Sequence, residues 1–316
     1  MKKFVAILLM LVLAATMCTA LAEEKTYTIG MSQCNLGEPW RVAMNDQIAA
    51  AAAEYPMFEV IYADAAQDNS KQIADIENFI QMQVDLIIAS PNEATPLTNV
   101  IKRAYESGIP VILLDRKIDG DTYTQFIGAD NVYIGRVCGE YVADVLLPDG
   151  GKICEIEGLA GTSGGIERDQ GFREGIAKNP KLEIIANNNA DWLREKAITV
   201  AEEMLQVNDE IDLFFALNDP MAEGAYIAAK NAGREKDMYF IGVDGLPTPD
   251  GGIRSVMDGR LSLSMVYPTG GKEAIESAHK LLVLGEELEK NVTLGTEVIT
   301  PDNAAELLVK YGGSVE

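Results

Sequence analysis

Histidine and cysteine are scarce in this sequence of 316 residues, which has one histidine, His279, and four cysteines. We expect Cys18 to be removed with an N-terminal segment, which leaves Cys34, Cys138 and Cys154. An odd count argues against a disulfide framework, although a Cys138–Cys154 bridge stays open. We therefore expect three small buried hydrophobic residues. Because paired Cys and His spacing is lacking, a zinc site is not expected, and we predict neither a metal nor a cofactor.

Basic residues are also few, since 26 lysines and arginines stand against 49 aspartates and glutamates, and the formal net charge is −23. Such a chain repels nucleic-acid phosphates and anionic lipid, so we expect no nucleic-acid partner. The charge and the lack of a helix-turn-helix pattern before the first predicted strand argue against a transcription regulator. The length is sufficient for two domains of ordinary size.

Only one long hydrophobic run is present, over residues 4–17, and it follows Lys2 and Lys3. It is too short and wrongly flanked for a membrane span and is typical of a secretory signal peptide. Residues 20–22, Ala-Leu-Ala, match an A-x-A cleavage site. We therefore predict a signal peptide over residues 1–22, whose two lysines take the formal charge from −23 to −25 when they are removed.

A lipoprotein anchored through Cys18 is the alternative to a cleaved signal peptide, but Met17 before this cysteine is a poor match to a lipobox. No later run is long and apolar enough to span a bilayer. We therefore expect a periplasmic or otherwise extracytoplasmic protein that is secreted by means of its signal peptide.

Beyond the signal peptide, short apolar runs alternate with amphipathic segments of helical period, which indicates βαβ units and a parallel sheet. The series restarts near residue 124, without a linker rich in Pro or Ser, so we predict an α/β protein with two Rossmann-like lobes. We predict a late helix over residues 271–284, a strand near 297–300 and a helix from 302. The earlier strands are expected near residues 26–31, 58–63, 86–89, 111–114, 124–128, 152–157, 182–186, 213–216 and 239–243.

Polar planar side chains and tryptophans lie just past the predicted strands. In open α/β sheets, ligands bind outside the carboxyl ends of the strands. The apolar run over residues 111–114 ends at Asp115 and Arg116, an acceptor beside a forked donor. Both tryptophans of the chain also fall in this set. We predict a binding site formed by Glu38, Trp40, Arg41, Asp115, Arg116, Arg168, Trp192, Asn218 and Asp244.

These side chains suit a sugar, because Asp, Asn and Arg can engage vicinal hydroxyl groups in pairs and indole rings pack on the apolar face of a sugar. Other interpretations stay open: a surface salt bridge between Asp115 and Arg116, tryptophans that only pack, and a simple turn at Asp244. A phosphate site at the glycine-rich residues 161–165 is disfavoured, because they lack the lysine of a P-loop. The arginines could instead bind a carboxylate group of a ligand. A glycosidase pair of Asp115 and Asp244 is disfavoured because Arg116 would keep Asp115 ionised. We therefore expect no enzyme.

At these residues the sequence resembles the periplasmic monosaccharide-binding proteins of ABC importers, of the ribose-binding type. The resemblance covers nearly all of the predicted mature chain. GEPWR, LLDRKID and ITPDNA look most like the galactofuranose-binding branch. The other motifs are VDLIIASPNEAT, GIPVILLDR, ADN at 129–131, GTSGGIERDQGF, ALNDPMAEGA and IGVDGLPTPDG.

The resemblance implies a periplasmic binding protein-like type I fold and places the ligand residues on the same nine positions. It implies three crossovers, near Ala129, near Met265 and near residues 292–297. The N-terminal lobe would comprise residues 23–128 plus 265–293, and the C-terminal lobe 129–264 plus 294–316. One departure concerns the crossover near Met265, where Met265 or Val266 replaces a polar residue of the family, and Tyr267 or Thr269 is a possible substitute.

The function implied by the resemblance is capture of a monosaccharide, a furanose such as galactofuranose or a pentose, and delivery to an ABC permease. A sugar-sensing receptor component for a chemoreceptor or sensor kinase is the alternative. We expect a monomer that closes its two lobes on the ligand.

Overall fold

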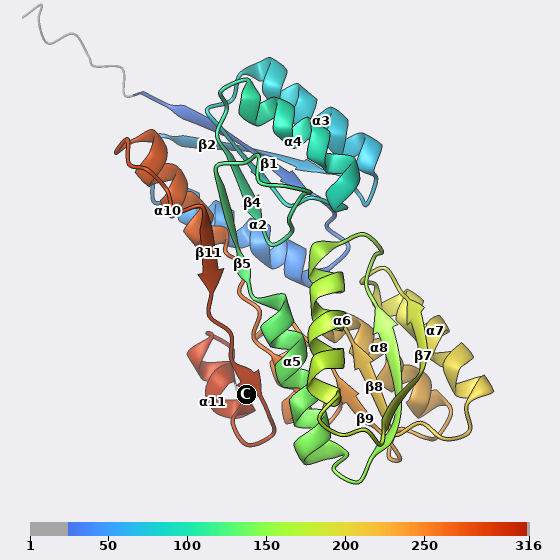
Figure 1. Cartoon of the computed structure of the whole chain (residues 1–316). Coiled ribbons are helices and arrows are strands. Elements are labelled where there is room, and N and C mark those ends of the chain that lie inside the picture. Colours follow the sequence, from blue (N-terminus) through green and yellow to red (C-terminus); the bar gives the residue numbers. More distant parts are fainter. Residues whose placement is uncertain (1–24, 315–316) are drawn as a thin grey trace, which may run out of the picture.

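Short apolar runs of the sequence form the parallel strands of two separate sheets (Figure 1). The structure, a computed structural model, describes residues 25–314, so the predicted signal peptide and Cys18 lie outside the described residues. The N-terminal lobe contains a six-stranded sheet of order β11-β5-β4-β3-β1-β2, with β1 (Tyr27–Gln33), β2 (Phe58–Asp64), β3 (Leu86–Ala89), β4 (Val111–Leu114), β5 (Gln125–Ala129) and β11 (Asn291–Leu294). The C-terminal lobe contains a four-stranded sheet of order β7-β6-β8-β9, with β6 (Gly151–Glu157), β7 (Leu182–Asn189), β8 (Leu213–Ala216) and β9 (Tyr239–Ile241).

Helices cover both faces of the N-terminal sheet, which explains why its central strands are apolar throughout. Successive side chains of a strand point to opposite faces. Ile87 and Ala89 pack with α3 and α4, whereas Leu86 and Ile88 pack with α2 and α10. These helices are α2 (Pro39–Ala52), α3 (Asn69–Met82), α4 (Ala94–Glu106) and α10 (Gly271–Leu282).

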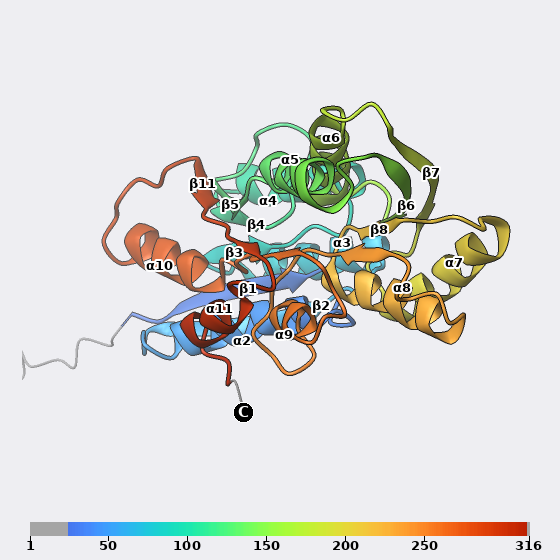
Figure 2. The same cartoon turned by 90° about the horizontal axis from the view of Figure 1, so that it is seen from below.

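The C-terminal sheet is also covered on both faces, by α5 and α6 on one side and by α7 and α8 on the other (Figure 2). The helices are α5 (Asn131–Tyr141), α6 (Ser163–Ile176), α7 (Arg194–Val207) and α8 (Asp219–Asn231), and α5 continues as a π-helix over Val142–Leu146. The prediction of a two-lobed α/β fold is therefore confirmed.

A small antiparallel ribbon of β10 (Ser264–Met265) and β12 (Val298–Ile299) lies where the chain passes between the sheets. The chain passes from one lobe to the other after β5, between β10 and α10, and between β11 and β12. Two short helices, α9 (Gly252–Met257) and α11 (Ala304–Lys310), pack on each other beside the ribbon.

The sequence analysis did not predict α9, β10 or β11. The segment of β11 was expected to be a crossover, but it pairs with β5 as a half-exposed edge strand, whose short apolar alternation is a weak signal. Some predicted bounds also differ. The strand predicted to end at residue 186 extends to Asn189, because its asparagines pair with β6.

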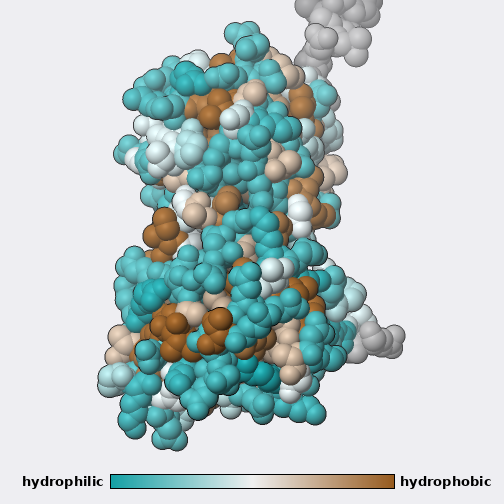
Figure 3. Space-filling model, turned by 90° about the vertical axis from the view of Figure 1, so that its right-hand side faces the viewer, coloured by the Kyte–Doolittle hydropathy of each residue, from teal (hydrophilic) through white to brown (hydrophobic). Residues whose placement is uncertain are grey.

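The surface of the molecule is largely hydrophilic. The face shown in Figure 3 is mostly hydrophilic, with separate hydrophobic patches over both lobes. None of the helices formed by residues 25–314 combines the length and the apolar character that crossing a bilayer requires.

Cys34, Cys138 and Cys154 are free and buried, as expected, and the Cys138–Cys154 bridge that had been left open does not form.

Candidate functional site

All nine residues of the predicted site line one cavity between the lobes, together with Gly164 and Tyr267. The cavity contains about 320 Å³ of space that no atom fills, counting the open space at its mouth. Each of the nine side chains, and Tyr267, belongs to a residue only 2–7% exposed. The cavity is therefore nearly closed, and its polar groups have little contact with bulk water.

Trp40 and Arg41 enter the cavity from the first turn of α2. Pro39 fixes the start of this helix in a position that proline favours, and Glu38 is the residue that precedes it. Asn35 donates a hydrogen bond of 2.7 Å from Nδ2 to Oε1 of Glu38, which holds that carboxylate in place. The indole Nε1 of Trp40 donates to the carbonyl oxygen of Tyr267 at 2.8 Å. The turn after β1 thus presents an indole, a guanidinium and a carboxylate to one space.

Asp115 is the central acceptor on the N-terminal side. Arg41 lies with Nη2 at 2.6 Å from Oδ2 of Asp115, and Nε of Arg116 lies 3.8 Å from the same oxygen. The hydroxyl of Tyr267 donates to Oδ1 of Asp115 at 2.6 Å. Burial alone would raise the pKa of Asp115, but Arg41 and Arg116 hold it below its usual range. Asp115 is therefore a buried ion-paired carboxylate, not the surface salt bridge that was the alternative.

The two arginines of this lobe are anchored by the segment after β3. Nη1 of Arg41 donates to Oγ of Ser90, and Nη1 of Arg116 donates to the carbonyl oxygen of Asn92, both at 2.9 Å. Each guanidinium has five donors, so these anchors orient it and leave other N–H groups for a ligand.

Arg168 lies on the C-terminal side and is held by two partners. Its Nε donates to Oδ1 of Asn131 at 2.7 Å, and its Nη1 donates to the carbonyl oxygen of Leu217 at 2.6 Å. Its guanidinium carbon also lies 4.4 Å from the centre of the Tyr267 ring. The guanidinium is thus fixed against an aromatic face, a geometry that favours a cation–π contact.

Glycines of α5 and α6 decide where Arg168 lies. A Cβ at Gly135 would lie 2.1 Å from the carbonyl oxygen of Arg168, and one at Gly171 would lie 2.1 Å from that of Val132. One turn further along, a Cβ at Gly139 or Gly175 would lie 2.4 Å from a backbone carbonyl oxygen of the other helix. The two helices can therefore approach closely only because all four positions lack a side chain.

Trp192 forms the wall on the C-terminal side, in a conformation that glycine usually adopts, with φ of 70°. A Cβ at Gly158 would lie 2.0 Å from its indole, so Gly158 makes room for the ring. Nδ2 of Asn218 donates to the carbonyl oxygen of Trp192 at 3.1 Å, while Oδ1 of Asn218 caps α8. The buried Nε1 of Trp192 has no hydrogen-bond partner among residues 25–314. It is a donor available to a ligand.

Asp244 is the acceptor on the C-terminal side and has no hydrogen bond or ion pair from its carboxyl group to any described residue. Burial, together with the negative charge of Asp219, raises the pKa of Asp244 well above its usual value. Asp219 lies behind it and accepts hydrogen bonds from Oγ of Ser264 at 2.6 Å and from the backbone N–H of Gly245 at 2.7 Å. Asp244 has φ of 142°, so its backbone is strained as well as its charge unpaired.

Tyr267 is the cavity residue that sequence reasoning placed only as a possible substitute. It lies in the passage between β10 and α10, and its hydroxyl also accepts from Nδ2 of Asn131 at 3.3 Å. Met265 and Val266 are buried but do not line the cavity, and Thr269 lines a different hollow. The available signal was the position of Tyr267 in a crossover. Only the folded chain distinguishes it from Thr269.

When all of its acidic and basic groups are ionised, the cavity lining balances its charges. Its carboxyl groups belong to Glu38, Asp115 and Asp244, and an equal number of guanidiniums belong to Arg41, Arg116 and Arg168. A ligand of either net charge would leave one kind uncompensated, which is costly in a buried site. A neutral ligand with several hydroxyl groups can use Asp244 as an acceptor and Trp192 as a donor.

The lobes also touch at the rim of the cavity, which seals it. Among the described residues, four hydrogen bonds or ion pairs join this rim, all from the N-terminal lobe to the loop and helix around α6 or to the turn before α7. They are Gln67 Nε2 to Asp191 O at 3.1 Å, Ala94 N to Gly161 O at 3.1 Å, Lys117 N to Ser163 Oγ at 3.0 Å, and Lys117 Nζ to Glu167 Oε1 at 2.6 Å.

Residues 29–287 match the periplasmic binding protein domain family. This range includes every residue that lines the cavity. The ribose import binding protein RbsB of Bacillus subtilis strain 168 is 34% identical over 272 residues, which cover 85% of this chain and 86% of that protein. The galactofuranose-binding protein YtfQ of Escherichia coli K12 is 30% identical over 301 residues, 92% of this chain and 93% of that protein. Among solved structures, the fructose-binding periplasmic domain of a hybrid two-component system superposes with a TM-score of 0.87 at 41% identity, over 90% of this chain and 94% of that one.

Proposed function

Because the chain belongs to the periplasmic binding protein family, we propose that it is a solute-binding protein that holds a neutral monosaccharide in the cavity between its lobes. The observation that carries this proposal is the charge-balanced, nearly closed cavity with an unpaired acceptor at Asp244 and an unpaired donor at Trp192. The resemblance inferred from the sequence agrees with the family match, and the relatives are binding proteins rather than enzymes.

We propose as ligand contacts the nine residues predicted from the sequence, with Tyr267 as a tenth. Hydrogen bonds to charged groups contribute roughly 1.5–3 kcal/mol each. Half a dozen of them exceed the roughly 8 kcal/mol of a micromolar complex, which leaves room for the cost of association. Names of relatives support a furanose or a pentose: ribose, galactofuranose and fructose are the sugars that these proteins bind.

Calorimetric titration of the mature chain against pentoses and hexoses tests the proposal, with ribose, fructose and galactofuranose in the panel. We expect micromolar or tighter binding of at least one sugar and a change in tryptophan fluorescence, because both indoles line the cavity. Binding of an amino acid or a phosphate ester, with no sugar bound, would overturn the proposal.

Delivery of the sugar to an ABC permease follows from the import proteins among the relatives. In this proposal a monomeric chain is exported by the signal peptide of residues 1–22, and its closed form docks on the permease. The proposed lobes are residues 23–128 plus 265–293 and residues 129–264 plus 294–316. Pull-down of permease subunits with sugar, and not without it, is the expected result.

A sensory role is a second candidate, and the likeness to the fructose-binding domain of a hybrid two-component system favours it. The same closed lobes would then contact a receptor or kinase. Adjacent genes for a permease and an ATPase would support transport, whereas an adjacent sensor kinase gene would support the sensory role.

A further inference from the structure

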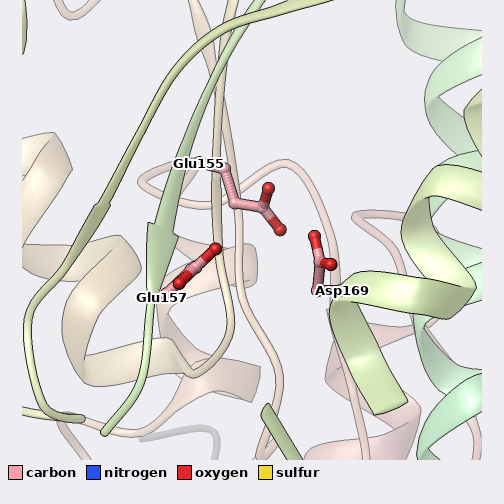
Figure 4. Close-up of side chains that lie close together, drawn as sticks. All are labelled: Glu155, Glu157 and Asp169. Atoms are coloured by element: carbon pink, nitrogen blue, oxygen red, sulfur yellow. The ribbon is translucent and has the colours of Figure 1, made fainter. Parts of the chain in front are cut away.

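A second group of acidic side chains lies in the C-terminal lobe, apart from the residues that line the sugar cavity (Figure 4). Glu155 and Glu157 lie on β6, and Asp169 lies on α6. One carboxylate oxygen of each lies within 4.8 Å of the other two. Glu157 and Asp169 also line a hollow together with residues 158–162, which contains about 420 Å³ of space that no atom fills, counting the open space at its mouth.

Glu155 is the member that needs a partner. Its side chain is fully buried, and only Oε2 is satisfied, by Nη2 of Arg173 at 2.9 Å. Oε1 has no hydrogen-bond partner among the described residues. Figure 4 shows the carboxyl group of Glu155 directed toward that of Asp169. Two ionised carboxylates are both acceptors, so neither can satisfy the other without a bridging proton or cation.

The charge of the group is also unbalanced. Arg173 is the cation paired with it, through Nη2 to Glu155 and through Nε to Oδ1 of Asp169 at 2.6 Å. When all three carboxyl groups are ionised, they and the one guanidinium leave a formal charge of about −2 in a partly buried place. That charge equals the charge of one divalent cation in magnitude.

We propose that Glu155, Glu157 and Asp169 bind a calcium ion. All the protein ligands are carboxylate oxygens, which suit hard cations and not zinc or copper. Calcium accepts 6–8 oxygens in flexible geometry, so water entering from the hollow can complete its shell, whereas magnesium requires near-ideal octahedral geometry. The expectation of no metal rested on the scarcity of Cys and His and did not weigh carboxylates on neighbouring elements.

The site would connect the end of β6 to α6 around residues 158–162. This loop carries Gly158, which makes room for Trp192, and Gly161, whose carbonyl oxygen accepts from Ala94 across the rim. A bound ion would therefore stabilise the side of the C-terminal lobe that faces the sugar cavity. This proposal does not depend on which sugar binds.

The test is a thermal-unfolding series on the mature chain after treatment with a chelator, in the absence of sugar. Calcium up to about 10 mM exceeds the ~10⁻⁴–10⁻³ M affinity typical of extracellular calcium modules. We expect a rise of about 2–4 °C in melting temperature with calcium, and little change with magnesium or with sodium at equal ionic strength. Terbium, a calcium substitute, should give emission sensitised by Trp192 through its contact with Gly158.

Two variants locate the ion. Glu155→Gln and Asp169→Asn should each lose the calcium response and weaken terbium binding at least about tenfold, whereas Glu183→Gln, which removes an exposed carboxylate on the neighbouring strand, should respond as the unaltered chain does. If Glu155→Gln does not fold, the more exposed Asp169→Asn carries the test. The proposal is wrong if calcium and terbium have no effect, if magnesium acts equally, or if both variants keep the response. Stabilisation by acid alone would show that a proton bridges the carboxylates, and would also overturn it.

Discussion

Asp115 connects three groups of the cavity, Arg41, Arg116 and Tyr267, through its two carboxylate oxygens. Its backbone has φ of 69°, a conformation that non-glycine residues rarely adopt. Strain of this kind persists where the surrounding structure enforces it, and it is common at ligand sites. The backbone conformation of Asp115, which directly follows β4, is therefore imposed by its contacts and is not the one that an aspartate prefers.

Replacing this carboxylate tests its role in binding. Asp115→Asn should weaken sugar affinity by at least about 2 kcal/mol, roughly 30-fold, because it leaves buried cationic groups without their charge partner. Without sugar, the lobes can open and water can reach those groups, so the melting temperature should change little. Calorimetry and thermal unfolding measure the two effects, with Asp121→Asn at an exposed position as control. A large loss of stability without sugar would assign Asp115 a structural role.

Asp219 makes stability depend on pH. Burial raises the pKa of Asp219 to about 6, against the lowering effect of its hydrogen bonds with Ser264 and Gly245. The pKa in the unfolded chain is ~3.9, so the folded state binds more protons between pH 4 and 6. Stability from this group therefore falls as pH rises through that window, and the full cost of about 3 kcal/mol is present above pH 6.

Asp219→Asn should remove this pH dependence. The amide can accept from Gly245 and donate to Ser264, whose hydroxyl can rotate, so both hydrogen bonds are kept. Denaturant unfolding between pH 4 and 7 should show the variant gaining stability over the unaltered chain as pH rises, and the two converging near pH 4. Parallel profiles for the two proteins would contradict the assignment.

At the scale of elements, the close pair of α5 and α6 positions the C-terminal half of the cavity. Gly171→Ala would push a methyl group against the backbone of α5, where its Cβ would lie 2.1 Å from the carbonyl oxygen of Val132. Overpacking of this kind costs typically ~1–3 kcal/mol of stability. It should also lower sugar affinity, because Arg168 lies on the displaced helix.

A matched substitution separates this effect from a general effect of glycine loss. Gly295→Ala places its Cβ in open space and should leave both the melting temperature and the affinity unchanged. The interpretation fails if Gly171→Ala melts and binds as the unaltered chain does.

At the scale of the whole molecule, contacts between the two lobes, each of which has its own sheet, would favour the proposed closed state. Lys117 and Glu167 form the charged part of this rim, with side chains 40% and 25% exposed. A partly exposed pair contributes ~0.2–1 kcal/mol. The double variant Lys117→Gln and Glu167→Gln should therefore weaken sugar binding by up to about fivefold and leave the stability of the sugar-free chain unchanged.

Small-angle scattering adds the structural measurement for this prediction. Sugar should reduce the radius of gyration of the unaltered chain, and the double variant should need more sugar for the same change, since a ligand shifts the population toward the closed state. Lys178→Gln, which breaks a pair with Glu140 inside the C-terminal lobe, is the control. Equal titration curves for the double variant and the control would show that the rim pair does not bias closure.

The sequence alone determined the order of strands and helices apart from α9, β10 and β11, and the runs that became β3, β4 and β8 match their predicted ranges. Each of these strands is a run of four buried apolar residues. Such a run indicates a parallel strand, because a strand that is covered on both faces has apolar side chains on both faces. It also determined the nine polar and aromatic residues at the strand ends, because the carboxyl ends of parallel strands lie at a shared edge.

Only the tertiary structure decided that Tyr267 joins those residues, that Asp219 lies behind Asp244, and that three carboxylates meet between β6 and α6. It also showed β11, an edge strand whose partner β5 is over 150 residues away in the chain. These features depend on contacts between distant segments. A local pattern determines which face a side chain takes, but the neighbours it meets there are set by how the lobes fold and close.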